Sequence, residues 1–406
     1  MPEASWLSGA SPAFRLILAT SWLAPESWRG NQEEAIRAAI GAGLDWTEYV
    51  RLVDRHRIPA LSWAALSRVP GILVPEPAKK QLQERSNACR MEAIKHCLLL
   101  AEVLKGFNRA GIPVMSMKGE IFSSELYGDP GLRQSRDLDL AVIRDDVGRA
   151  QACLESMGWR LDSTWFPLSP RQLECVMRRE YHFGFVHSNA NYILELHWRN
   201  PWDTPAQTSD IWARSVQSCW QGCLYRAMSP GDLVPYLCNH GSDHLWFRAK
   251  WLGDLARAHT AGQVDWEELL SEARRTGQQR VLLLGLRLLN LVFGLPLPNL
   301  PEKQFPGLPL LLIERPLRAL KNPGEPDTRG ALALLRDRVR MSRYQMLLRP
   351  RKTWWETLSQ FSYNREDFKV LRLPDRLFLG YVPLRPFLWA WRWLRQSGNQ
   401  TRKHVA

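Results

Sequence analysis

Asp137-Leu138-Asp139-Leu140-Ala141-Val142 alternates between acidic and apolar side chains, and this alternation predicts a β-strand. Side chains two residues apart on a strand share a face, so Asp137 and Asp139 point to the same side, roughly 6–7 Å apart along the chain. Two carboxylates aimed at one point repel each other unless a cation lies between them. The stretch therefore predicts a site for a hard divalent cation such as Mg²⁺. Two solvated acids on an exposed strand are the alternative interpretation.

Residues upstream of this strand could bind the phosphates that such a cation attracts. Lys118-Gly119 ends a short strand candidate, and a glycine there lets a phosphate approach the free N–H groups at the start of the next helix. Arg133 and Ser135 lie just before the two acids, where they can reach phosphate oxygens. The upstream sequence therefore predicts a phosphate-binding turn.

A third acid lies on a later strand candidate, Tyr192 to Trp198. Glu195 has Ile193 and His197 as partners on its face, while the neighbouring apolar side chains face away. A third carboxylate on a strand adjacent to the first would complete a two-metal site.

Hydrophobic periodicity divides the chain into four predicted regions. Apolar spacing of three and four predicts helices before Gly111, and the mixed pattern after it predicts a small α/β unit. Helical periodicity resumes after Pro230-Gly231, and prolines are frequent between 295 and 327. The predicted regions are an N-terminal helical region (1–110), an α/β core (111–200), a helical domain packing over that core (201–300), and a Pro-rich connector with a basic, Arg- and Trp-rich helical region (301–406).

The composition fits a globular chain with an excess of positive charge. Of 406 residues, 45% are hydrophobic and 23% are charged, and 54 Lys and Arg oppose 41 Asp and Glu, which excludes wholesale disorder. The seven Cys form no CxxC pair, so we expect buried free thiols in a reducing compartment, with a zinc site at Cys219 and Cys223 as the alternative. No signal peptide and no spanning segment of ~20 apolar residues is evident, so we expect a cytoplasmic protein.

The C-terminal region suggests a surface for a negatively charged partner. Residues 336–352 carry seven basic side chains against one acidic side chain. A polyanionic acceptor, an anionic membrane and a solvated helix face each explain this excess. Leu377 to Leu394 is apolar and Trp-rich but interrupted by Arg and Pro, so it could lie at a membrane interface or pack against the helical shell.

The order of these motifs resembles a known family. Met117-Lys118-Gly119, Leu126 to Arg133, Arg136 to Leu140 and Glu195-Leu196-His197-Trp198 are similar to motifs of the uncharacterised bacterial nucleotidyltransferases of the polymerase-β-like superfamily. Further similar segments are Arg55 to Leu61, Leu237 to Gly241 and His244 to Ala256, so the likeness covers most of residues 35–395. It implies an α+β fold, in which a polymerase-β-like core with a small mixed sheet is embedded in a largely helical chain.

The resemblance also implies an activity. A nucleoside monophosphate would pass from an NTP, with ATP expected, to a hydroxyl or phosphate on a small molecule, peptide or protein, releasing pyrophosphate. A natural product or polysaccharide precursor is a plausible acceptor. Asp137, Asp139 and Glu195 would be catalytic and would hold two Mg²⁺ ions, with Mn²⁺ as the alternative. The residues expected to bind the nucleotide are Lys118, Gly119, Arg133, Ser135, His244 and Lys250.

Some residues depart from this pattern or allow a second interpretation. Glu120 follows the motif glycine where the superfamily has Gly or Ser, and an acid there would repel a triphosphate. Lys250 and Asp254 could instead be an ordinary i,i+4 pair on a solvated face. A zinc helix at His240 and His244 is a weak alternative, because no metalloprotease glutamate accompanies them. We expect two other histidines, His56 and His182, to be structural.

Two other functions remain open from the sequence. The positive charge would suit a nucleotidyltransferase that modifies RNA or tRNA, although no RNA-binding module is recognisable. Glu120 would suit a catalytically weak nucleotide-binding or scaffold protein.

Overall fold

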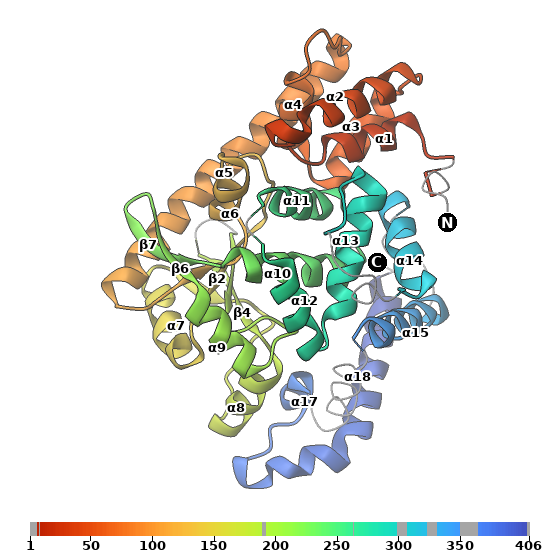
Figure 1. Ribbon diagram of the computed structural model, residues 1–406. Coiled ribbons are helices and arrows are strands. Elements are labelled where there is room, and N and C mark those ends of the chain that lie inside the picture. Colours follow the sequence, from red (N-terminus) through yellow and green to blue (C-terminus); the bar gives the residue numbers. More distant parts are fainter. Residues whose placement is uncertain are drawn as a thin grey trace.

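The computed structural model describes residues 6–7, 9–188, 192–262, 264–298, 307–322, 331–349 and 364–403. It is a largely helical α+β fold built around one mixed sheet (Figure 1). The predicted fold class is therefore confirmed.

Five helices precede the sheet. They are α1 (Pro12–Thr20), α2 (Glu26–Gly41), α3 (Trp46–His56), α4 (Pro59–Ser67) and α5 (Glu76–Arg109). Ser11 and Asp45 cap α1 and α3, because their side chains accept backbone N–H groups of the first turn. The long helix α5 links the N-terminal helices to the sheet (Figure 1). Its second half buries Leu104 and Phe107 in the core below the sheet.

Seven strands form the sheet in the order β3-β4-β5-β2-β1-β7-β6. β1 pairs with β7 and β2 with β5 in parallel, and the other neighbours are antiparallel. The strands are β1 (Met115–Ser116), β2 (Asp137–Ala141), β3 (Trp159–Leu161), β4 (His182–His187), β5 (Ile193–His197), β6 (Val216–Trp220) and β7 (Cys223–Ala227).

The two central strands have one apolar and one polar face. Leu138 and Leu140 of β2 and Leu194 and Leu196 of β5 are fully buried in one core cluster. Because side chains alternate along a strand, the intervening acids point to the opposite face. Burial of one face thereby fixes the register and the direction of the acids.

Short helices follow the strands, and a helical layer covers the polar face. The connecting elements are α6 (Glu120–Tyr127), η1 (Arg144–Asp146), α7 (Val147–Ser156), α8 (Pro170–Arg179) and α9 (Pro205–Arg214). The layer consists of α10 (Pro230–Asp243), α11 (Ala249–Thr260), α12 (Trp266–Arg275) and α13 (Gln279–Phe293). A Cβ at Gly253 of α11 would collide with the backbone carbonyl oxygen of Ser21, so α11 approaches the end of α1 as only a glycine permits.

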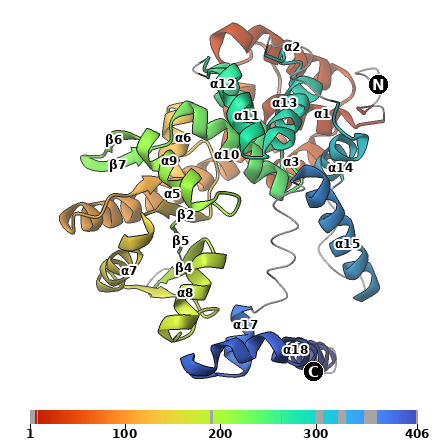
Figure 2. The same ribbon diagram turned by 60° about the horizontal axis from the view of Figure 1, so that its bottom comes forward.

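The C-terminal elements fall into two groups that lie apart from each other (Figure 2). α14 (Leu310–Lys321) and α15 (Ala331–Leu348) lie beside α13, whereas α17 (Arg365–Val370), η3 (Asp375–Gly380) and α18 (Tyr381–Lys403) form a separate unit that contacts α8. None of the helices in the described ranges has the length and apolarity needed to cross a bilayer.

The strands β1, β2 and β5 agree with the strand candidates of the sequence analysis. β3, β6 and β7 were missed, so the sheet extends to Ala227, beyond the end at residue 200 that was predicted for the core. The stretch predicted as a connector contains the helix α14. The four-region division of the chain remains a prediction.

Candidate active site

Two neighbouring strands bring the three predicted acids to one face of the sheet. In the parallel register of β2 and β5, Asp139 lies beside Glu195, and Asp137 lies beside Ile193. Residues opposite each other on adjacent strands share a face. Asp139 is buried, whereas Asp137 and Glu195 are partly exposed. Acids from two distant stretches of sequence therefore meet at one open-sided position, which we call the carboxylate centre.

Basic side chains neutralise this centre. Nε2 of His197 lies 3.2 Å from Oδ1 of Asp139 and 3.2 Å from Oε2 of Glu195. The Nζ of Lys118 lies 3.2 Å from the same oxygen of Asp139. From β4, Nε2 of His182 lies 3.9 Å from Oε1 of Glu195. One imidazole thus bridges the two carboxylates, and one ammonium group neutralises the buried one.

The charges of the centre shift its pKa values together. Burial raises the pKa of Glu195, but the hydrogen bond and charge of His197 outweigh it and lower that pKa to about 2. Burial likewise opposes ionisation of Asp139, yet Lys118 and His197 lower its pKa. Burial lowers the pKa of His197, but its two carboxylate partners raise it overall. Both acids are therefore ionised at neutral pH.

The donor atoms at the centre fit a divalent cation. One ligand atom from each of His182, Glu195 and His197 lies within 4.8 Å of the other two. The buried Nδ1 atoms of both histidines have no hydrogen-bond partner. Carboxylate oxygens suit Mg²⁺, and the added imidazole nitrogens also suit Mn²⁺. That His182 is structural remains a prediction, and its ring is part of this cluster.

A large cavity begins beside Asp137. Its volume is about 450 Å³, within the range of small-molecule sites. The Oγ of Ser135, which lines it, donates to the backbone oxygen of Asp137 at 3.0 Å. Gly119 has a φ of 88° and lies against the backbone of Asp137, so the predicted glycine turn is present next to the centre. The charged or hydroxyl-bearing residues of the lining are Asp54, Arg57, Arg85, Glu92, Glu120, Arg133, Ser135 and Arg136.

Three arginines from separate segments gather near this cavity. Arg57 and Arg136 line it. The backbone N–H of Ala249 donates to Nδ1 of His56 at 3.0 Å, which joins the segment of Arg248 to that of Arg57. Burial, together with the charges of Arg57 and Arg136, lowers the pKa of Arg248 to about 10. We call Arg57, Arg136 and Arg248 the arginine cluster.

The arginine cluster lacks counter-charges of its own. Across the described ranges, no carboxylate forms an ion pair with Arg57, Arg136 or Arg248, and the buried Nε of Arg248 has no hydrogen-bond partner. Clustered like charges repel one another, and an anion bound among them relieves that repulsion. The cluster is thus suited to a multiply charged anion.

Glu120 is paired in this structure. Its Oε1 lies 2.7 Å from Nδ1 of His96 on α5, and both side chains are buried. Burial lowers the pKa of His96, but Glu120 raises it overall. The raised pKa favours the positively charged form of His96. This charge offsets the negative charge of Glu120, the residue that departs from the family pattern.

A second charged group near the cavity is fully enclosed. The Nε of Arg133 donates to Oδ2 of Asp254 at 2.8 Å, and the Tyr127 hydroxyl donates to Oδ1 at 3.1 Å. Lys250 is also buried, and its Nζ donates to the backbone oxygen of Gln134 at 3.0 Å. The interpretation of Lys250 and Asp254 as a pair on a solvated face is therefore wrong. Nucleotide binding by Arg133 and Lys250 remains a prediction.

The two other metal sites considered from the sequence are not found as clusters of potential ligands in the described residues. Among the described residues, neither Cys219 and Cys223 nor His240 and His244 belongs to a group of potential metal ligands. His244 is exposed and stacks on Trp251, with ring centroids 4.8 Å apart. Its predicted contact with the nucleotide remains a prediction.

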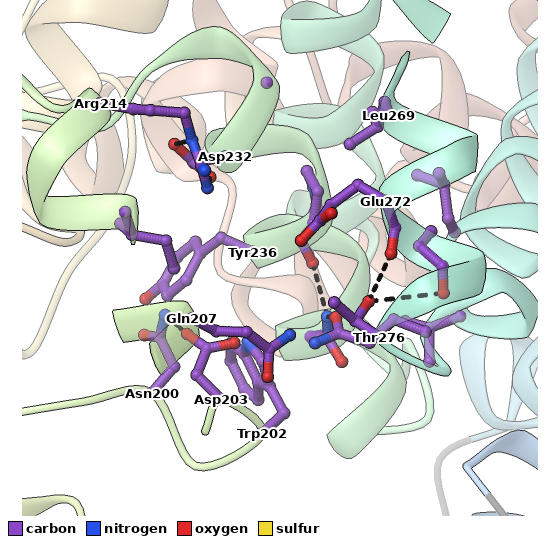
Figure 3. Close-up of a pocket in the computed structure, with 18 residues that line it drawn as sticks. Asn200, Trp202, Asp203, Gln207, Arg214, Asp232, Tyr236, Leu269, Glu272 and Thr276 are labelled. Carbon is purple, nitrogen blue, oxygen red and sulfur yellow. Dashed lines mark hydrogen bonds and ion pairs between the residues drawn. The ribbon is translucent and has the colours of Figure 1, made fainter. Parts of the chain in front are cut away.

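A smaller cavity is lined by residues of α9, α10, α12 and α13 and of the segment after β5 (Figure 3). Its volume is about 70 Å³, too small for a nucleotide. Asn200, Asp203, Gln207 and Tyr236 point toward one another in its wall, and Thr276 closes another part. Tyr236 lines this cavity, and burial raises the pKa of its phenol, on which the charges of Lys118 and Asp139 also act.

Comparison with known proteins identifies the family. A family model described as an uncharacterised nucleotidyltransferase matches residues 42–294, more than half of the chain. The chain belongs to this nucleotidyltransferase family. The family and the transferase class predicted from the motifs are thereby confirmed.

Two solved structures resemble part of this nucleotidyltransferase. One is the solution structure of the antibiotic-resistance factor ANT(2'')-Ia, at 15% identity and a TM-score of 0.33, covering 45% of this chain and 92% of that one. The other is the crystal structure of ANT(2'')-Ia with adenylyl-2''-tobramycin, at 14% identity and a TM-score of 0.33, covering 45% and 97%. No curated protein sequence matched the chain.

The sequence analysis missed several residues of the candidate site. His197 carried a usable signal, because it is two residues from Glu195 on one strand face. Arg57 and Arg248 lie in segments that resemble the family, but nothing in the sequence joins the two segments, which meet in the fold where the backbone N–H of Ala249 donates to His56. Tyr236 resembled an ordinary buried aromatic residue of a helix.

Proposed function

We propose that this nucleotidyltransferase transfers a nucleoside monophosphate from an NTP to a hydroxyl or phosphate on a small molecule, peptide or protein, with release of pyrophosphate. One observation carries the proposal. The parallel register of β2 and β5 aligns Asp139 with Glu195, beside a cavity of nucleotide size that begins at Asp137.

The arginine cluster is the proposed site for the phosphate tail of the nucleotide. A triphosphate carries several negative charges, and three guanidinium groups without ion-pair partners complement them. Ser135 and the backbone at Gly119 lie between this cluster and Asp137 and would orient the phosphates toward the carboxylate centre.

The proposed metal ligands are Asp137, Asp139 and Glu195, with His197 and His182 as nitrogen donors. A divalent cation bound there would neutralise the phosphates and lower the pKa of the attacking hydroxyl. Because the pKa of Glu195 is lowered to about 2, this side chain is a poor proton acceptor and is suited to holding a cation. Lys118, freed from Asp139 by such a cation, can turn to a phosphate oxygen.

The small cavity is the proposed entry for one polar group of the acceptor. Amide, carboxylate and phenol groups line it, and they can align a hydroxyl by hydrogen bonds. A volume of about 70 Å³ admits one functional group and leaves the rest of the acceptor outside.

The test is incubation with each of ATP, GTP, CTP and UTP, in the presence of Mg²⁺ or Mn²⁺. Pyrophosphate release is measured, and the masses of the protein and of candidate acceptors, tRNA included, are determined. A gain of one nucleoside monophosphate is expected, whereas a gain of one phosphate would indicate kinase chemistry and contradict the proposal. Modification of tRNA alone would favour the RNA-modifying alternative.

Asp137→Asn and Asp139→Asn provide the matched test of the residues. We expect each to lower turnover by about 1,000-fold or more, because each removes charge from the proposed cation site. Asp145→Asn is the control, since Asp145 is an exposed acid beyond the end of β2. Equal turnover in Asp139→Asn and Asp145→Asn would rule out the assignment.

A further inference from the structure

In the unit formed by α17, η3 and the first half of α18, the charged side chains of α18 face inward and its apolar side chains face outward. Every exposed residue between Tyr381 and Arg392 is apolar, whereas the two charged residues in this stretch, Arg385 and Arg392, are only partly exposed. A surface helix of a globular protein ordinarily turns its charged face outward. This helix therefore presents apolar side chains to its surroundings.

The inward charges of α18 have a defined structural role. Arg385 and Arg392 pair with the fully buried Asp367 of α17, at 2.6 Å and 3.0 Å. The hydroxyl of Tyr381 donates to the backbone oxygen of Leu371 at 2.7 Å and accepts from Gln172 of α8. These polar contacts fix the helix on its support and leave its apolar side outward.

The exposed apolar side chains are large and concentrated. Phe387 is 73% exposed, Leu379 is 70% exposed and Trp389 is 58% exposed. In the described residues, all exposed large aromatic hydrophobics of the chain lie in this unit. We define the C-terminal face as the exposed residues Leu377, Leu379, Val382, Leu384, Phe387, Trp389 and Trp391. Leu384, Phe387 and Trp391 share one side of the helix α18, and Val382 and Trp389 share another. Apolar exposure on this scale marks an interaction surface.

The charges beside the C-terminal face have one sign. Lys369, Arg372 and Arg376 are exposed next to it. The three acids of the unit are paired: Asp367 is buried by its arginines, Asp375 accepts hydrogen bonds from Ser169 and Arg171 at the start of α8, and Glu366, whose side chain is 41% exposed, lies 3.6 Å from the Nε of Arg365. The surface thus combines Trp, Phe and Leu with cations, the composition of a segment that lies in an anionic membrane interface.

We propose that the C-terminal face docks on the anionic surface of a lipid bilayer. The apolar side chains enter the interface, and the flanking cations contact lipid phosphates. A second copy of the chain fits less well, because a symmetric contact would bring the same cations together. Since no described helix can span a bilayer, the contact is peripheral. Docking would hold the nucleotidyltransferase beside acceptors present at the membrane.

The test is co-sedimentation of the full chain with vesicles at low salt. Vesicles of phosphatidylcholine alone are compared with vesicles of phosphatidylcholine mixed with phosphatidylglycerol. We expect binding that rises with the anionic lipid and falls with added salt. Phe387→Glu/Trp389→Glu is expected to weaken binding by about 10-fold or more, because these two side chains lie on different exposed sides of α18, so that one of them enters the interface whichever side docks.

Two further variants keep the test decisive. Leu73→Glu/Leu98→Glu changes two equally exposed apolar residues elsewhere and is expected to bind like the wild type. Arg372→Glu/Arg376→Glu removes only the charges and is expected to abolish the preference for anionic lipid, even if the first variant fails to fold. Absence of wild-type binding, or binding unchanged in both C-terminal variants, would overturn the proposal. So would a concentration-dependent dimer that Phe387→Glu/Trp389→Glu dissociates.

Discussion

Two charged groups within the same fold differ in how completely they are enclosed. Arg133, Asp254 and Tyr127 form a closed group, in which the guanidinium and the carboxylate are 3% and 0% exposed. The carboxylate centre is open on one side, because the side chain of Glu195 is 28% exposed and that of Lys118 is 15% exposed.

This difference separates a structural ion pair from a site. In the closed group both carboxylate oxygens of Asp254 have donors, so this carboxylate has no free position for a cation. In the open centre the Nδ1 atoms of His182 and His197 lack partners, and the ligand atoms of His182, Glu195 and His197 already lie close together. The two groups contain similar residue types. The carboxylate centre is the candidate functional group because its side chains are accessible and incompletely paired.

The largest expected effect on stability concerns the closed group. Asp254→Asn should lower the free energy of unfolding by about 3–5 kcal/mol, because it leaves the buried guanidinium of Arg133 without a counter-charge. Asp139→Asn should cost less than half as much, since Lys118 reaches solvent and remains near Glu195. Urea unfolding of both variants and of the exposed control Asp145→Asn measures the difference. Equal losses of unfolding free energy in Asp254→Asn and Asp139→Asn would contradict the distinction between the closed group and the carboxylate centre.

A smaller effect is expected at the arginine cluster. Arg57→Ala and Arg248→Ala should each raise the KM for the NTP by about 10-fold while the free energy of unfolding changes little, because each removes a cation that has no ion-pair partner in the described residues. Arg85→Ala is the matched control, since Arg85 lines the same cavity but pairs with Asp54 at 2.8 Å. A KM that rises only in the control would move the phosphate site away from the cluster.

Much of the fold followed from local pattern. The alternation around Asp137 and around Glu195 predicted β2 and β5, and helical periodicity predicted the long helix α5. β6 and β7 escaped prediction, because several of their residues are exposed and their apolar pattern is weak. Strand order could not be read locally, since β5 pairs with β2 across more than fifty residues of intervening chain.

The site was predictable where residues share one strand and unpredictable where helices meet. Spacing along β2 and β5 identified the acids, and the glycine turn at Gly119 was expected from sequence. The hydrogen bonds between Arg133 and Asp254 and between His96 and Glu120 depend on long-range packing, which no short motif encodes. The arginine cluster likewise exists only once α11 is placed against the end of α3.

The most direct test of the carboxylate centre is equilibrium binding of Mn²⁺ in the absence of nucleotide, measured by electron paramagnetic resonance. The proteins compared are the wild type, Asp139→Asn, Glu195→Gln and Asp254→Asn. We predict saturable binding by the wild type, at least ~10-fold weaker binding when Asp139 or Glu195 is changed, and binding retained in Asp254→Asn at a temperature where that variant is folded. Mn²⁺ binding that is unaffected by the changes at Asp139 and Glu195 would contradict this prediction.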